Sequence, residues 1–200
     1  MITNISQLDL NKTYSYADYL TWQFEQYVEL IKGKIWKMSP APRTKHQRVS
    51  LNLSGLFYNY LRATACKAFA APFDVRLYDK KKSEKVNQDI FTVVQPDLCI
   101  ICDKTKIDEL GCLGAPDLIV EILSPGNSRK EMRVKYELYE ESGVREYWVA
   151  DPERQTVHVF GLNENEVFES KKIFVSDDVM HSFIFPDLLI DLNEIFQENE

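Results

Sequence analysis

The alternation of apolar and polar positions predicts two long helices and a series of short strands. Apolar residues recur at helical spacing from Thr44 to Leu61 and again in residues 129–142. Runs of aliphatic and β-branched residues bounded by turn residues predict the strands. Two of these runs, residues 97–102 and 117–123, each open with a Pro-Asp pair, and Pro is tolerated at the start of a strand. The functional interpretation is built on these two runs and the helix that follows them.

The other elements are predicted from local signals. Ser15 and Asp18 have capping-box spacing and open a short helix, and Gly143 is a helix C-cap. The remaining strands are a hairpin turning at Lys32-Gly33, a strand at 69–79, two strands at 145–151 and 155–161, and one near 171–175. The chain then ends in a short amphipathic segment within residues 182–196.

This element order predicts an α+β (α/β-like) fold with a central mixed β-sheet flanked by helices. The chain has 200 residues, 44% of them hydrophobic, and no low-complexity run. We therefore expect a single globular domain over residues 1–200 with a sizeable core.

Residues 97–102 and 117–123 are expected to pair as antiparallel strands around a connection centred near Leu110. That register places Asp97 opposite Glu121 and Ile101 opposite Asp117. Directly opposite residues have Cβ atoms about 5 Å apart, which is close enough for two carboxylates to share one divalent cation. Asp117 and Glu121 are about 13 Å apart along one strand and cannot both bind that cation. Asp97 with Glu121 is the predicted metal pair.

Lys135 falls inside the apolar face of the predicted helix at 129–142. On a helical wheel it lies among the apolar positions, whereas Arg133 and Glu137 lie on the opposite side. A lysine aimed at a core needs a partner, because an unpaired buried ammonium is costly. One interpretation is an i, i+4 pair with Glu131 or a stem that reaches back to solvent. The favoured interpretation is that Lys135 points at the carboxylates of the two preceding strands.

Three other polar features carry weaker signals when taken alone. Glu29, in the first strand of the hairpin, is expected to be solvated. His46, in the first turn of the long helix, is more often a cap or a surface group, although helix N-termini favour anions such as phosphate. The polar, mostly basic segment from Lys80 to Gln88 is interpreted as a solvated connector, with contact to a phosphate backbone as the alternative.

The net charge of −7 and the pI near 5.1 argue mildly against a protein that coats nucleic acid by bulk attraction. They do not exclude an enzyme with a local basic groove. We find no basic region followed by an apolar run at the N-terminus and no apolar stretch of membrane-spanning length. A cytoplasmic protein without a membrane partner is the resulting expectation.

The four cysteines, at positions 66, 99, 102 and 112, are interpreted as buried free thiols. Cys99 and Cys102 have the spacing of half a zinc site, but they lie in a strand where the two side chains face opposite ways. Other chemistries lack their motifs: there is no Gly-x-Gly-x-x-Gly after a strand, no Walker-type Gly-Lys-Ser/Thr and no Gly-x-Ser-x-Gly.

Two acids on neighbouring strands and a nearby lysine resemble the signature of the PD-(D/E)XK nuclease superfamily, and more specifically the Uma family of restriction-endonuclease-like proteins. The matching stretches are YVELIKGKIWKMSPAP, VQPDLCIICD, GAPDLIVEILSP and KYELYEESGVREYWVADP. The resemblance covers roughly residues 14 to 195 and implies a restriction-endonuclease-like core.

The resemblance also implies roles for individual residues. Asp97 matches the acid of the first motif and Glu121 the acid of the second. The superfamily's lysine would stand at position 123, which is Leu123 here, and Lys135 matches the place to which this family moves it. The family's N-terminal glutamate, which completes the metal shell, matches Glu29, and His46 is similar to a histidine of the same pocket. Where the family commonly has Asp, this chain has Glu131.

The implied activity is a Mg²⁺- or Mn²⁺-dependent endonuclease that hydrolyses phosphodiester bonds of DNA, with Asp97, Glu121 and Glu29 as metal ligands and Lys135 and His46 as further catalytic residues. Superfamily analogy also implies a homodimer, because cutting a duplex needs two sites. Two alternatives stay open. In the first alternative, the chain is a nuclease-fold binding or assembly module without catalysis. In the second, Asp97 and Glu121 pair with Lys135 as a buried ion pair that has only a structural role.

Overall fold

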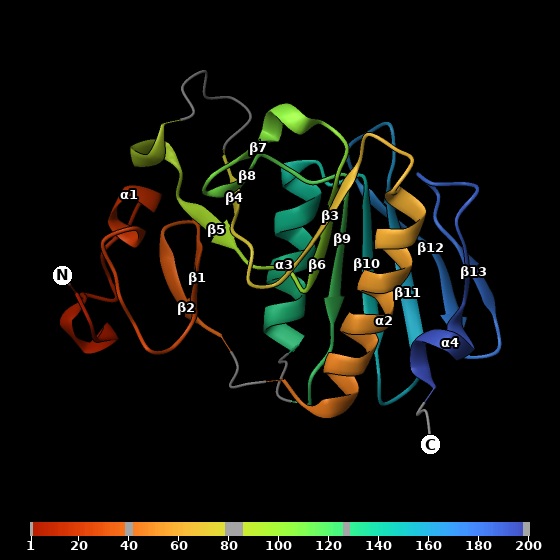
Figure 1. Ribbon diagram of the computed structural model, residues 1–200. Helices are drawn as coiled ribbons and strands as arrows, with labels where there is room; N and C mark the ends of the chain where they lie inside the picture. The colour runs from red at the N-terminus through yellow and green to blue at the C-terminus, as the bar shows by residue number, and fades with distance from the viewer. Residues whose placement is uncertain (1, 39–41, 79–85, 126–128, 198–200) are drawn as a thin grey trace.

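The computed structural model describes residues 2–38, 42–78, 86–125 and 129–197 (Figure 1). Its main helices are α2 (Thr44–Leu61) and α3 (Arg129–Ser142), with the short helices α1 (Tyr16–Tyr19) and α4 (Leu192–Phe196) near the two ends of the chain. The predicted connector at 80–88 lies largely outside the described residues, and residues 87–89 at its end form a 3-10 turn (η2, Asn87–Asp89).

In the part of the chain that the structure describes, the strands form two six-stranded sheets and one two-stranded sheet. The central sheet has the order β12-β11-β10-β9-β6-β3, with the following bounds: β3 Lys67–Ala70, β6 Leu98–Ile101, β9 Leu118–Ile122, β10 Glu146–Asp151, β11 Thr156–Leu162 and β12 Phe168–Val175. All its neighbours are antiparallel except β9 and β10, which run parallel. The mixed central sheet of the predicted α+β fold is therefore confirmed.

The second sheet has the order β2-β1-β5-β4-β8-β7. Its strands are short: β1 Val28–Ile31, β2 Lys34–Lys37, β4 Val75–Leu77, β5 Thr92–Val94, β7 Ile107–Asp108 and β8 Gly111–Leu113. Strands β13 (Val179–His181) and β14 (Leu189–Asp191) pair with each other near the C-terminus. The sequence patterns do not separate this second sheet from the first, because hydrophobic alternation does not record which sheet a strand joins.

The two faces of the central sheet are covered by different elements. On one face, Leu98 and Ile100 of β6 and Leu118 and Val120 of β9 pack with the buried side of α2 and with the C-terminal segment. On the other face, Cys99 and Ile119 pack with α3 and the second sheet. Helix α3 thus lies between the two sheets (Figure 1), and any polar side chain on that face of β9 must find its partners among these elements.

The predicted pairing of the two Pro-Asp strands is confirmed. Strands β6 and β9 are antiparallel, with Leu98 opposite Val120 and Ile100 opposite Leu118. The connection between them is more elaborate than a loop, because residues 104–113 form a 3-10 turn (η3, Lys104–Lys106) followed by β7 and β8, which join the second sheet. This excursion keeps the register of the pair intact.

Helix boundaries agree with the sequence signals. The capping box of Ser15 and Asp18 opens α1, and Gly143, with φ of +84°, follows the last residue of α3. The predicted single strand at 69–79 is wrong: β3 and β4 belong to different sheets, and a cis peptide bond joins Ala71 to Pro72 between them.

The cysteine prediction is half correct. Cys99 and Cys112 are buried free thiols, but Cys66 and Cys102 form a disulfide. These two residues flank β3 and β6 directly beyond the paired residues Lys67 and Ile101. Because the pairing of β3 with β6 joins segments about thirty residues apart, no local pattern indicated it. Within the described residues, no helix is long and apolar enough to cross a membrane.

A buried carboxylate fixes the C-terminal segment on the sheet. Glu146 of β10 is 0% exposed and accepts hydrogen bonds from Trp148 Nε1 (2.6 Å), Ser182 Oγ (2.8 Å), Phe183 N (3.0 Å) and Ile184 N (2.9 Å). A buried carboxylate needs hydrogen-bond donors for its oxygens, and these four donors supply them.

We predict that Glu146→Ala lowers the free energy of unfolding by about 3 kcal/mol or more, because several buried donors lose their acceptor at once. The measurement is urea denaturation followed by tryptophan fluorescence. The matched control is Glu153→Ala, whose exposed carboxylate pairs with Lys45 and should change stability by less than about 1 kcal/mol. Equal unfolding midpoints for the two variants would contradict the structural role of Glu146.

Candidate functional site

Five sequence-predicted residues converge where the start of β6, the end of β9, the first turn of α2 and the buried face of α3 meet. A cavity of about 100 Å³ lies there. Its lining includes Glu29, His46, Asp97, Glu121 and Lys135. Antiparallel pairing explains part of this convergence, because it brings the residue before β6 beside the end of β9.

Asp97 is held by two donors. Its Oδ2 accepts from the Ile122 backbone N–H at 2.7 Å, and its Oδ1 lies 3.2 Å from His46 Nε2. Burial alone would lower the pKa of His46, but the hydrogen bond to Asp97 and the nearby carboxylates raise it above its ordinary value. Among the described residues, the buried Nδ1 of His46 has no hydrogen-bond partner. The histidine therefore orients Asp97 and keeps one nitrogen unsatisfied.

Lys135 joins two of the acids. Its Nζ donates to Glu121 Oε1 at 2.9 Å and to Glu29 Oε1 at 3.1 Å, and the side chain is buried. Burial would lower the pKa of Lys135, but the two carboxylates hold it well above its usual value. The prediction that Lys135 points at the carboxylates is confirmed.

Glu29 is buried, so its expected solvation is wrong. It is 4% exposed because β1 is covered on both faces. Besides Lys135, its Oε1 accepts from the Gln95 backbone N–H at 2.9 Å. The single glutamate in a four-residue strand carried no local sign of burial, whereas the family resemblance pointed to it.

Two further residues were missed as polar members of the site. Tyr139, predicted only as an apolar position, donates its hydroxyl to Glu121 Oε1 at 2.6 Å. It stands one helical turn after Lys135, so the period of α3 could have shown that both reach the same carboxylate. Gln95, which precedes Asp97 by two residues, also lines the cavity. Its side-chain Nε2 donates a hydrogen bond to Asp74 Oδ1 at 2.8 Å.

Asp117 lies apart from the site, in agreement with the predicted separation from Glu121. Its Oδ2 accepts from the Cys102 backbone N–H at 2.8 Å, and its Oδ1 pairs with Arg145 at 3.1 Å. Asp117 directly precedes β9, and Cys102 directly follows β6, so this hydrogen bond links the start of β9 to the end of β6.

Glu121 concentrates the electrostatic cost of the cavity. Burial raises the pKa of Glu121 to about 7; Lys135 opposes this rise, and the charges of Asp97 and Glu29 add to it. Lys135 contacts Glu29 and Glu121, and the third carboxylate of the cavity, Asp97, pairs with His46. Because the negative charges outnumber the ammonium group, the arrangement favours an additional cation or a proton.

Comparison with known proteins identifies the family. A family model, Uma2, described as "Putative restriction endonuclease", matches residues 16–193. The chain belongs to the Uma2 family. The predicted family is therefore confirmed.

Its fold is similar to that of a crystal structure from Anabaena variabilis described as "a putative nuclease belonging to DUF820". The TM-score is 0.69, the alignment covers 92% of this chain and 97% of that one, and the sequences are 21% identical. An uncharacterized protein from Synechocystis sp. is 27% identical over 124 residues, which is 61% of this chain and 60% of the relative. The match thus spans about three fifths of that relative's length.

In this Uma2 chain, no group of three or more His, Cys, Asp or Glu side chains is arranged to hold a metal ion among the described residues. Lys135 occupies one oxygen of both Glu29 and Glu121. Mg²⁺ needs only one or two carboxylates because it keeps several waters, so the donor chemistry of Asp97 and Glu121 is compatible with it. Their role as metal ligands stays a prediction.

We predict that Glu121→Gln flattens the pH dependence of stability. An acid whose pKa is raised on folding binds its proton more tightly when folded, so its contribution is present below its unfolded pKa and is lost as pH rises toward 7. The wild type should lose up to about 3 kcal/mol more than the variant between pH 4.5 and 7.5. Urea denaturation across this range measures the difference, and parallel pH profiles would contradict the raised pKa.

Proposed function

We propose that this protein is a divalent-metal-dependent nuclease that hydrolyses phosphodiester bonds of DNA. The observation that carries the proposal is the convergence of Glu29, Asp97 and Glu121 with Lys135 around one cavity. Membership in a family described as "Putative restriction endonuclease", together with a fold similar to that of "a putative nuclease", supports phosphodiester hydrolysis as the reaction class.

Asp97 and Glu121 would hold Mg²⁺ or Mn²⁺, with Glu29 as a third ligand. Their carboxylate oxygens are the hard donors that these ions prefer. The pKa of Glu121 is raised first by burial and further by the charges of Asp97 and Glu29, and a bound cation would favour its ionised form. When bound, such a cation polarises a phosphate and makes a coordinated water more acidic.

The protein's own groups position the reaction. Lys135 is a fixed cation, buried and oriented by two acids, that can stabilise negative charge developing on phosphoryl oxygens. The Ile122 N–H and His46 Nε2 hold the two oxygens of Asp97 in place.

A second candidate is a nuclease-fold binding module without catalysis. The observation that favours it is that Lys135 already neutralises Glu29 and Glu121 at 3.1 and 2.9 Å. If that ion pair persists in solution with Mg²⁺ present, the cavity has only a structural role. The homodimer expected for duplex cleavage remains part of the first proposal.

We predict that the wild type binds Mg²⁺ or Mn²⁺ and nicks supercoiled plasmid, and that Glu121→Gln lowers the nicking rate by about 100-fold or more. Isothermal titration calorimetry measures the binding, and gel analysis of plasmid forms measures the nicking.

Asp117→Asn is the matched control, because it removes a carboxylate charge next to the same strand but outside the cavity, and its activity should stay near that of the wild type. Nicking by Glu121→Gln at the wild-type rate would overturn the proposal. Metal binding without cleavage of plasmid, single-stranded DNA or RNA would favour the binding module.

A further inference from the structure

The charge of this acidic chain is unevenly distributed. Residues 30–73 contain no Asp or Glu and hold eight of the 24 Lys and Arg residues. The rest of the chain therefore carries 16 basic residues against 31 acidic ones. A protein of net charge −7 thus has one continuous basic segment. Such a segment attracts polyanions locally even though the whole molecule repels them.

That segment builds the elements on one side of the site. It includes β2, α2 and β3, and it provides His46 to the cavity described above. Strand β3 is the edge strand of the central sheet. Its last residue, Ala70, pairs with Leu98, and the next residue, Ala71, donates its backbone N–H to the Asp97 carbonyl at 3.2 Å. The basic segment and the site are therefore contiguous along one edge of the sheet.

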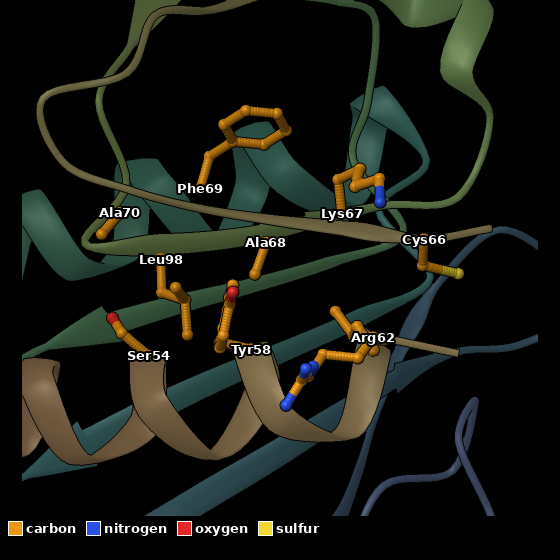
Figure 2. Close-up of a pocket in the computed structure, with 10 residues that line it drawn as sticks. Ser54, Tyr58, Arg62, Cys66, Lys67, Ala68, Phe69, Ala70 and Leu98 are labelled. Atoms are coloured by element: carbon orange, nitrogen blue, oxygen red, sulfur yellow. The ribbon is translucent and has the colours of Figure 1, made fainter. Parts of the chain in front are cut away.

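A groove of about 580 Å³ lies between α2 and β3 (Figure 2). Helix α2 and the residue after it contribute Ser54, Tyr58, Leu61 and Arg62 to its walls. The other wall is formed by residues 66–70, with Leu98 from the neighbouring strand. The groove is several times larger than the cavity at the carboxylates, and no acidic side chain of the described residues lines it.

The lining combines the three groups that bind an unpaired nucleotide strand. Tyr58 is 68% exposed, so its ring is available to a base. Arg62, directly after α2, supplies positive charge on the helix side of the groove. The Lys67 side chain lies on the same side of β3 as Phe69, away from α2 (Figure 2), so it adds positive charge at the edge of the sheet and not inside the groove. Neither residue takes part in an ion pair among the described residues. Ala68, Leu61 and Leu98 form apolar surface in the groove. Aromatic stacking with flanking cations is the recurrent mode of single-strand recognition.

We propose that the groove between α2 and β3 binds a single-stranded segment of nucleic acid adjoining the site. Bases of a duplex are stacked on each other and are not free to stack on Tyr58, so the groove selects an unpaired segment such as a flap, a bubble or a free end. This inference names the substrate class of the proposed nuclease, and it rests on that function only for what happens after binding.

The test is fluorescence anisotropy with a 5′-fluorescein-labelled single-stranded oligodeoxythymidylate of 12 nucleotides, in EDTA so that cleavage plays no part. We expect the wild type to bind and Tyr58→Ala to weaken binding about tenfold, with Tyr58→Phe close to the wild type because the ring is kept. Arg62→Ala should also weaken binding and should reduce the slope of log K against log salt by about 0.7, because one phosphate contact of a single strand is lost.

Arg133→Ala is the matched control, because it removes an exposed cation from α3 outside the groove. Thermal melts verify that each variant is folded. Groove variants that bind as tightly as the wild type would overturn the proposal, as would a wild type that binds only duplex of the same length. If the wild type binds through the groove but nicks no substrate with Mg²⁺, the groove stands and the nuclease proposal fails. If the wild type nicks plasmid but the groove variants bind as tightly as the wild type, the nuclease proposal stands and the groove proposal fails.

Discussion

The structure of the site depends on one buried ionic interaction, in which the ammonium group of Lys135 lies between the carboxylates of Glu29 and Glu121. Each partner comes from a different layer: β1 from the second sheet, β9 from the central sheet, and α3 between them. Removing Lys135 leaves two buried carboxylates without a countercharge. The cost of that is greater than the net contribution of the intact ion pair to stability. This interaction therefore connects β1 of the second sheet and β9 of the central sheet through α3. In the proposed nuclease, the same atoms would serve both stability and chemistry.

Local signals were sufficient for most of the elements and for the core of the site. Helix α2 and helix α3 follow the apolar period with the boundaries predicted from Thr44 and Gly143. The register of β6 with β9 followed from the two Pro-Asp strand starts, and the inward position of Lys135 followed from the helical wheel. These features share a cause: each depends on residues within one or two adjacent elements, where period and turn chemistry act directly.

Features that depend on distant pairing could not be read in this way. The burial of Glu29 requires a strand from the second sheet to be covered on both sides, and alternation within four residues does not record that. The Cys66–Cys102 disulfide requires β3 to return beside β6. The division of the strands between two sheets likewise depends on contacts across the whole chain. The family resemblance supplied Glu29 because relatives carry information about tertiary structure that a single local pattern lacks.

Helix α2 has a geometric consequence for any nucleic-acid strand that would reach from the groove to the cavity at the carboxylates. It carries His46 in its first turn and Tyr58 twelve residues later on one continuous α-helix, and at 1.5 Å per residue these positions are about 18 Å apart along its axis. Because an α-helix has a fixed rise per residue, the distance between Tyr58, where a base would stack, and His46, beside the proposed cleavage site, is constant. Products released from such an arrangement would share a constant offset from the held base, whatever their sequence.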